Sequence, residues 1–220
     1  MVIRNRLLAF LTRVVILVLL SSSLGAYLAE AATWARLLEF ETEVAIIYLI
    51  VLGFSALFNL IDLRHGIRGI AAGFYMPMNL CLVGFCFVSN AFYFAYGLPT
   101  GMASSSINSI IFHAMFLALP TLEWLLFNIK GTVRWHSAFT AMSYPILYVV
   151  FMGFRALIWP KAVLPNGTMY PYPFLAPGWN MFVLWAILSF AVVYGVLLAY
   201  IFLNNFLAGK YRVGQEVNPF

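Results

Sequence analysis

Two side chains of this sequence have the chemistry for acyl transfer, the hydroxyl of Thr42 and the imidazole of His113. A threonine hydroxyl is a poor nucleophile until a base takes its proton. A neutral histidine suits that task because it can accept the proton and return it to the leaving alcohol. His113 lies in the apolar stretch IIFHAMFLALPTLEW (110–124), where an ionisable group is costly and indicates function by default. The alternative is a structural histidine that is hydrogen-bonded to a neighbouring helix.

Five more polar residues are expected at the level of that imidazole. Asn108 and Ser109 lie about one turn before it on the same expected helix and could orient its ring. Arg155, near the end of a later helix, could bind a substrate carboxylate. Tyr170 and Tyr172, in the loop that follows, could contact the substrate or its oxyanion. A nucleophile, a base, a cation and phenols at one level predict an acyl-transfer site.

Each of these residues also has a structural interpretation. Thr42 suits the N-cap of a helix, with Glu41 and Glu43 near the positive end of the helix dipole. In the catalytic interpretation, the free N–H groups of the same first turn would stabilise an oxyanion. Arg155 could instead extend to lipid headgroups, and the tyrosines could belong to an aromatic belt at the membrane surface. The residue types leave both interpretations open.

Glu123 follows His113 by ten residues but belongs to another part of the molecule. At a rise of about 1.5 Å per residue, the two side chains are separated by about 15 Å along one helix. Glu123 therefore cannot orient the imidazole. We expect it to be a structural anchor near the other end of the span, where it can reach headgroups or a basic loop residue such as Lys130.

The composition is that of a membrane protein. The chain has 220 residues, of which 64% are hydrophobic and 9% charged, and its mean hydropathy is +0.96. Soluble domains carry about 25% charged residues, so a water-soluble fold is excluded. The net charge of +5 is best explained by basic loops, and no nucleic-acid partner is expected. Cys81 and Cys86 support neither a disulfide framework nor a metal site, and no cofactor is predicted.

Apolar runs of membrane-spanning length recur six times along the chain. The first also resembles a signal peptide, with Arg4 and Arg6 before it and AEA after it, but is expected to remain as a helix. The sequence predicts one all-α domain over residues 1–220, a polytopic membrane bundle of six transmembrane helices. The expected helices cover 7–29, 42–62, 69–96, 107–128, 136–159 and 179–207.

Basic residues predict the orientation of this bundle. Eight of the twelve Lys and Arg residues flank the helices on the side of the chain ends, and three lie on the other side. Positively charged loops stay in the cytoplasm, so both termini are expected to be cytoplasmic. The loop over about 160–178 then lies on the outer side, and its Asn166-Gly167-Thr168 forms a glycosylation sequon whose use the sequence leaves open.

Several segments resemble one known family. They are FET (40–42), HAMFLALPTLEWLLF (113–127), SYPILYVVFMGFRALIW (143–159) and YPYPFL (170–175). In this order and with six helices, they resemble the androgen-induced-gene family of membrane proteins, which includes the androgen-dependent regulator of tissue-factor-pathway inhibitor, and its bacterial relatives. The resemblance implies an intramembrane threonine hydrolase that cleaves fatty-acid esters of hydroxy fatty acids. Thr42 matches the nucleophile of that family and His113 matches its base.

The sequence therefore predicts an intramembrane hydrolase of fatty-acid esters that uses a Thr42–His113 pair near the outer leaflet. Its expected partners are membrane lipids and a lipid ester substrate. The alternative is a non-catalytic accessory subunit of a larger membrane complex, with partner subunits in place of a substrate. A transporter has less support, since the sequence shows neither repeat symmetry nor a chain of charges across the bilayer midplane.

Overall fold

The protein is described by a computed structural model over residues 6–30, 33–65, 72–101, 103–131, 133–159, 161, 163–175 and 178–208. Within these residues the chain is helical and has no β-strand, which confirms the all-α prediction. The α-helices are α1 (Arg6–Ala29), α2 (Thr33–Arg36), α3 (Phe40–His65), α4 (Ala72–Phe92), α5 (Ile107–Phe127), α6 (His136–Ala141), α7 (Ser143–Ile158) and α8 (Trp179–Leu207). A π-helical turn, η1 (Tyr93–Gly97), continues α4, and a 3₁₀ turn, η2 (Pro173–Leu175), precedes α8.

Six helical segments of the described chain are long and apolar enough to cross a membrane. They are Leu7–Ala29, Phe40–Ile61, Met76–Gly97, Ile107–Phe127, His136–Ile158 and Trp179–Leu207. Each exceeds the roughly 20 residues that a bilayer requires. Six long apolar helical segments are therefore found where the sequence predicted them, although residues 69–71 of the third lie outside the described part of the chain.

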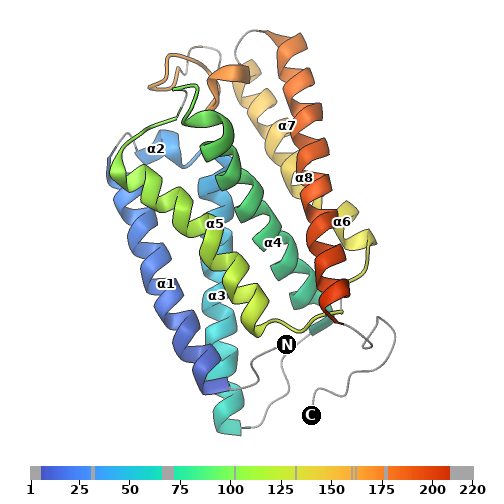
Figure 1. Ribbon diagram of the computed structural model, residues 1–220. Coiled ribbons are helices and arrows are strands. Elements are labelled where there is room, and N and C mark those ends of the chain that lie inside the picture. The colour runs from blue at the N-terminus through green and yellow to red at the C-terminus, as the bar shows by residue number, and fades with distance from the viewer. Residues whose placement is uncertain are drawn as a thin grey trace.

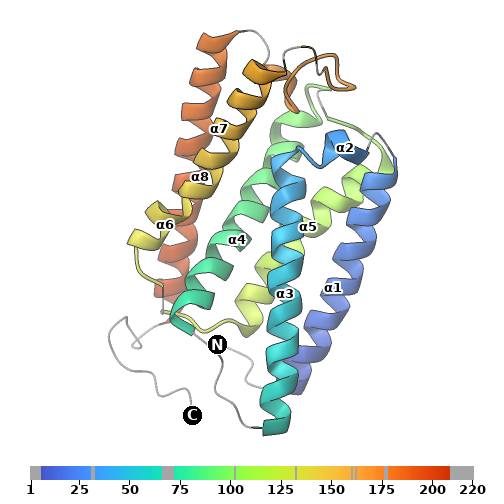
Figure 2. The same cartoon turned by 180° about the vertical axis from the view of Figure 1, so that it is seen from behind.

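Helix α4 is the central helix of the bundle. It packs against α3, α5 and α8, and 61% of the residues in its most apolar window are buried, against 17% in α8. Gly84 permits close packing there, because a Cβ atom at this position would lie 2.8 Å from Leu197 Cδ2 of α8. Helix α1 covers the other side, against α3 and α5 (Figures 1 and 2).

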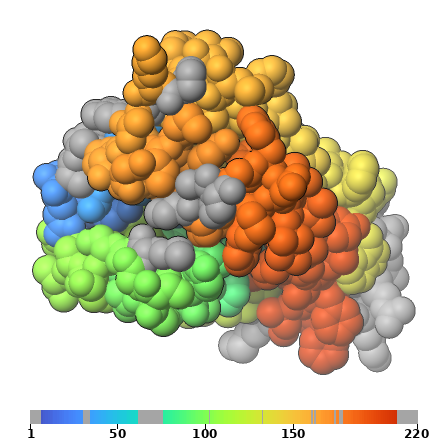
Figure 3. All heavy atoms as spheres, turned by 90° about the horizontal axis from the view of Figure 1, so that it is seen from above, coloured from blue at the N-terminus to red at the C-terminus, as the bar shows by residue number. Residues whose placement is uncertain are grey.

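The bundle has two different ends. Helix α1 begins and α8 finishes at one of them, which we call the terminal end (Figure 1). The opposite end, which we call the loop end, carries α2 and the segment 163–175. Seen from above, that segment lies between the region of α1 and α2 and helix α8 (Figure 3). Helices α7 and α8 diverge from α3 and α5 toward the loop end (Figure 2).

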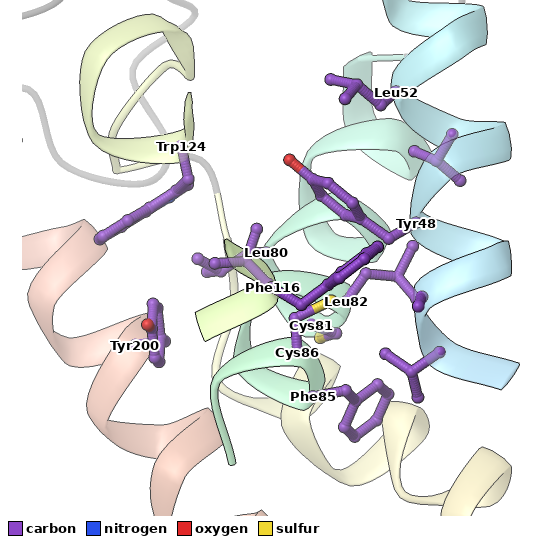
Figure 4. Close-up of a cluster of buried hydrophobic side chains, with 14 of the residues drawn as sticks. Tyr48, Leu52, Leu80, Cys81, Leu82, Phe85, Cys86, Phe116, Trp124 and Tyr200 are labelled. Carbon is purple, nitrogen blue, oxygen red and sulfur yellow. The ribbon is translucent and has the colours of Figure 1, made fainter. Parts of the chain in front are cut away.

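Large apolar side chains fill the centre of the bundle. Tyr48 of α3, Leu80 of α4, and Phe116 and Trp124 of α5 are almost completely buried and converge between the helices (Figure 4). Cys81 and Cys86 are buried among them as free thiols. Such packing holds helices together in lipid, where the hydrophobic effect does not favour helix association.

The expected helix over 136–159 is interrupted. Helix α6 ends at Ala141 and α7 begins at Ser143, with a turn at Met142. Pro145 explains the break, because it has no N–H for the carbonyl of Ala141 and its ring would crowd that carbonyl. The chain consequently bends between α6 and α7 (Figure 2).

The start of α3 differs from the prediction. The helix begins at Phe40, so Thr42 lies inside its first turn, and the Thr42 N–H donates to the Glu39 carbonyl at 3.1 Å. The interpretation of Thr42 as an N-cap is therefore wrong. The short helix α2 was not predicted. Its Arg36 donates from Nη1 to the Tyr27 carbonyl at 2.5 Å and so connects α2 to the end of α1.

A buried ion pair joins two helices near the terminal end. Arg13 Nε of α1 lies 2.7 Å from Glu123 Oε1 of α5, and Asn128 Nδ2 donates to Glu123 Oε2 at 3.1 Å. Both charged side chains are buried. Glu123 thus makes a structural ion pair, as its predicted role requires. Its partner is Arg13 of another helix and not Lys130.

Lys130 makes different contacts. Its ammonium group donates to the Trp124 carbonyl at 2.5 Å and lies 4.1 Å from the centroid of the Trp124 ring. Burial lowers the pKa of Lys130 to about 8, although the Glu123 carboxylate acts in the opposite direction. Lys130 is thus a second donor to the Trp124 carbonyl, which also accepts from the Asn128 N–H at 3.2 Å at the end of α5.

Candidate functional site

A cavity of about 400 Å³ lies at the loop end. Residues of α1, α3, α4, η1, α5, α7 and α8 line it, together with Ala35 and Arg36 of α2 and residues of the segment 163–175. Most of the lining is apolar or aromatic, as in ordinary small-molecule sites. The polar lining side chains from α1, α2, the start of α3, α5 and the loop include Tyr27, Arg36, Glu39, Glu41, Ser109, His113 and Tyr172.

His113 is held in one orientation. Its side chain is 2% exposed, and Nδ1 lies 2.7 Å from the backbone carbonyl of Ser109. A carbonyl oxygen can only accept a hydrogen bond, so Nδ1 carries the hydrogen. In the neutral ring, Nε2 is then the unprotonated nitrogen, which is the form that a general base requires. This atom lies 3.9 Å from Oε1 of Glu41.

Aromatic rings fix the plane of the imidazole. The Tyr93 ring stacks on it, with centroids 3.7 Å apart and an interplanar angle of 10°, and Tyr27 meets it edge-on at 5.5 Å. Tyr93 is the first residue of the π-helical turn η1, in which the Leu98 N–H donates to the Tyr93 carbonyl at 2.7 Å. Such turns are frequent at functional sites because they reorient side chains within a helix.

Glu41 stands opposite His113, and sequence reasoning assigned it only to the helix dipole. Glu39, to which sequence reasoning gave no role, lines the same cavity. The Tyr27 hydroxyl donates to Glu39 at 2.6 Å, and the Tyr172 hydroxyl donates to Glu41. Burial, together with the charge of Glu41, raises the pKa of Glu39 to about 8. The sequence feature that could have revealed this site was the group of acidic residues next to an apolar segment, together with tyrosines elsewhere in the chain that could donate to them.

Thr42 does not belong to the cavity lining. It is completely buried, and its hydroxyl makes no hydrogen bond of ordinary geometry with the described residues, although it is close enough to Glu39 to lower the pKa of that carboxyl slightly. The α3 side chain that faces His113 Nε2 is its neighbour, Glu41. The Thr42–His113 pair therefore stays a prediction.

Two further predicted residues line the cavity and one does not. Ser109 contributes its backbone carbonyl to His113, while its hydroxyl, in a residue 1% exposed, has no hydrogen-bond partner among the described residues. Tyr172 reaches the site from the loop and also accepts from the Phe40 N–H at 2.9 Å. Asn108 is half-buried outside the lining.

Arg155 and Tyr170 contact the loop and α8 outside the cavity lining. Arg155 donates from Nη1 to the Met169 carbonyl at 2.5 Å and so connects α7 to the loop. The Tyr170 ring packs against Phe182 of α8, with centroids 5.3 Å apart. Neither is a lining residue, so their predicted roles in substrate binding stay predictions.

The sequon residue Asn166 organises the loop. Its Nδ2 donates to the carbonyls of Tyr170 and Pro171 at 2.8 and 3.0 Å, and its Oδ1 accepts from the Thr168 N–H at 3.0 Å. Gly167 allows the turn, with φ at 78°. The nitrogen that would carry a glycan is thus engaged in the loop over the cavity.

No protein-family model, curated protein or solved structure matches this chain. The resemblance to the androgen-induced-gene family therefore remains a hypothesis. Among the described residues, no group of three or more His, Cys, Asp or Glu side chains could hold a metal ion. The site consists of an oriented imidazole, two carboxylates and several phenols beside an apolar cavity.

Glu39 provides a test of this electrostatic arrangement. Its folded pKa of about 8 exceeds its ordinary value of 4.5, so the folded state holds the proton more strongly than the unfolded state. Its contribution to stability is complete below pH 4.5 and is lost as the pH rises toward 8. We expect the melting temperature in detergent to fall over this interval, and to fall less in Glu39→Gln. Equal slopes in the two proteins would contradict the assigned protonation.

Proposed function

We propose that this chain is an intramembrane hydrolase of lipid esters whose site is the loop-end cavity. The observation that carries the proposal is the orientation of His113, with Nδ1–H donated to Ser109 and Nε2 available beside an apolar cavity. A buried ionisable group in a membrane span indicates function by default. The resemblance to the androgen-induced-gene family supports the same chemistry.

Thr42 is the proposed nucleophile. Its buried hydroxyl makes no hydrogen bond of ordinary geometry with the described residues, and it follows Glu41, whose carboxylate faces the imidazole. In the reaction, His113 Nε2 takes the Thr42 proton while the hydroxyl oxygen attacks the ester carbonyl. The imidazolium returns the proton to the leaving alcohol, and water then cleaves the acyl-threonine with His113 again as base.

Glu41 has a proposed electrostatic role in this reaction. The imidazolium that forms would carry its new proton on Nε2, which lies 3.9 Å from the Glu41 carboxylate. Negative charge at that distance stabilises the cation. Tyr172 holds the carboxylate in place through its hydroxyl. We expect Glu41 to assist proton transfer without forming a covalent bond.

The proposed orientation places the loop end in the outer leaflet. The basic residues that flank the helices are concentrated on the side of the terminal end, and such residues remain in the cytoplasm. An even number of spans returns the described chain to its starting side. Water for the second step would then come from the outer surface.

The test is hydrolysis by the purified chain in nanodiscs. The substrates are a panel of fatty esters that includes esters of hydroxy fatty acids, and the variants are Thr42→Ala and Thr42→Ser. We expect Thr42→Ala to lose activity by about a thousandfold or more, because the covalent route is removed, and Thr42→Ser to retain part of it. Equal activity in the wild type and Thr42→Ala would exclude the threonine nucleophile.

One observation favours a second candidate, a non-catalytic accessory subunit. Thr42 is absent from the cavity lining, and a carboxylate occupies the position opposite His113. In that case the polar groups would hold α1, α3, α5 and the loop together, and partner subunits would replace the substrate. Purified chain without hydrolysis of any ester, together with co-purifying membrane subunits, would favour this candidate.

A further inference from the structure

The loop-end cavity is lined by more acidic than basic side chains. Glu39 and Glu41 line it, and Arg36 is the only Lys or Arg among its described lining residues. The Arg36 guanidinium is already engaged, since Nη1 donates to the Tyr27 carbonyl and Nη2 lies 3.8 Å from Oε2 of Glu30. Its positive charge is therefore shared with a third carboxylate outside the lining.

The two acidic side chains of the lining accept hydrogen bonds from tyrosine hydroxyl groups and not from cationic side chains. Tyr27 donates to Glu39 at 2.6 Å and Tyr172 donates to Glu41. His113 Nε2 stands 3.9 Å from Glu41, which is too far for a hydrogen bond. After burial, repulsion from Glu41 is the next cause of the raised pKa of Glu39. A positive group in the cavity would relieve this repulsion.

Aromatic rings continue from the carboxylates along the cavity. Tyr172 stacks on Phe174, with centroids 5.5 Å apart, and Phe174 meets Phe92 at 5.6 Å and Trp185 at 5.1 Å. Tyr96 of η1 lies 5.9 Å from Trp185. All five rings line the cavity. Ring faces attract organic cations, and the attraction is strongest when the cation is removed from water.

A polar group that needs a partner lies in the same lining. Ser109 is 1% exposed, and its hydroxyl has no hydrogen-bond partner among the described residues. Buried hydroxyl groups are normally satisfied, so an unpaired one beside a cavity indicates a ligand that pairs with it. A primary ammonium group can donate to this oxygen, whereas a quaternary ammonium group can only contact the rings and carboxylates.

We propose that the loop-end cavity binds the ammonium headgroup of an amphiphile, whose apolar chain lies along α8. Leu188, Val192 and Val193 of α8 supply the apolar wall. Arg155, which sequence reasoning placed at a substrate carboxylate, is not among the lining residues. The cavity would therefore select against anionic headgroups. This proposal does not depend on ester hydrolysis and is tested with molecules that contain no ester.

The experiment is calorimetric titration of the full chain in dodecyl maltoside, an uncharged detergent. The probes are hexyltrimethylammonium, hexylammonium and hexanoate, which share an apolar tail and differ in the head. We expect at least one ammonium probe to bind about tenfold or more tightly than hexanoate. A preference for hexylammonium would indicate that the Ser109 hydroxyl contacts the ammonium group directly. A preference for hexyltrimethylammonium would indicate that the aromatic rings contribute more of the binding free energy.

Glutamine variants locate the binding site. Glu39→Gln and Glu41→Gln are each expected to weaken binding of the ammonium probe by about tenfold. Glu43→Gln is the matched control, because Glu43 lies on the same helix, accepts from the Tyr144 hydroxyl at 3.0 Å and does not line the cavity. Binding in this control should be unchanged.

Two results would overturn the proposal. One is the lack of any preference for the ammonium probes over hexanoate in the wild type. The other is a preference that survives in the Glu39→Gln/Glu41→Gln double variant.

Where a glutamine variant does not fold, Ser109→Ala and Phe174→Leu probe the same cavity without changing its charge, and both are expected to weaken binding severalfold. Ammonium binding without ester hydrolysis would leave this proposal intact and contradict only the proposed enzyme.

Discussion

Replacement of His113 by alanine is expected to lower the rate of ester hydrolysis by about 10²- to 10⁴-fold, the usual contribution of a general base. The loss follows from the geometry, because Nε2 is the unprotonated nitrogen and lies at the cavity. The variant keeps the nucleophile but leaves no group to take its proton. Rates with a soluble chromogenic fatty ester, measured in nanodiscs, check this expectation.

Chemical rescue distinguishes a base from a packing residue. The missing ring of His113→Ala leaves space beside a cavity of about 400 Å³, and added imidazole can occupy it. We expect imidazole to restore part of the activity of this variant. His136→Ala is the control, because His136 begins α6 and is remote from the cavity lining, and its activity should be close to that of the wild type. Full activity in His113→Ala without imidazole would refute the proposed base.

Removal of either member of the Arg13–Glu123 pair is expected to destabilise the protein by about 3–5 kcal/mol. The two side chains are 6% and 1% exposed, and their 2.7 Å contact joins α1 to α5. Arg13→Leu would leave the Glu123 carboxylate buried with Asn128 as its only hydrogen-bond donor among the described residues. Glu123→Leu would in turn remove the carboxylate that accepts from the buried Arg13 guanidinium.

The double variant Arg13→Leu/Glu123→Leu is the control for this pair. Two leucines remove both buried charges together, and such replacements are often neutral or stabilising. We therefore expect the double variant to be more stable than either single variant. Unfolding by sodium dodecyl sulfate, followed by circular dichroism in mixed micelles, measures the three free energies. A double variant no more stable than the weaker single variant would show that the ion pair is not the source of the loss.

The local sequence was sufficient to predict the six long apolar helical segments. Six apolar runs required six spans, because a bilayer has no water to satisfy the backbone outside a helix. Pro145 causes the interruption between α6 and α7. A proline within an apolar run, however, does not reveal from the sequence how far the helix will bend. The π-helical turn at Tyr93 had no recognised signal, although it places the ring that stacks on His113.

What the sequence by itself determined about this protein is the all-α fold with six apolar helices of membrane-spanning length, and the unusual position of His113 within one of them. The tertiary structure decided which groups surround that imidazole, because contacts between helices depend on how each helix is rotated about its axis. Two neighbouring residues of α3 point in directions about 100° apart, so a one-residue difference exchanges Thr42 for Glu41 opposite Nε2. The same limit applies to Glu123, whose partner Arg13 is distant in sequence and adjacent only in the folded bundle.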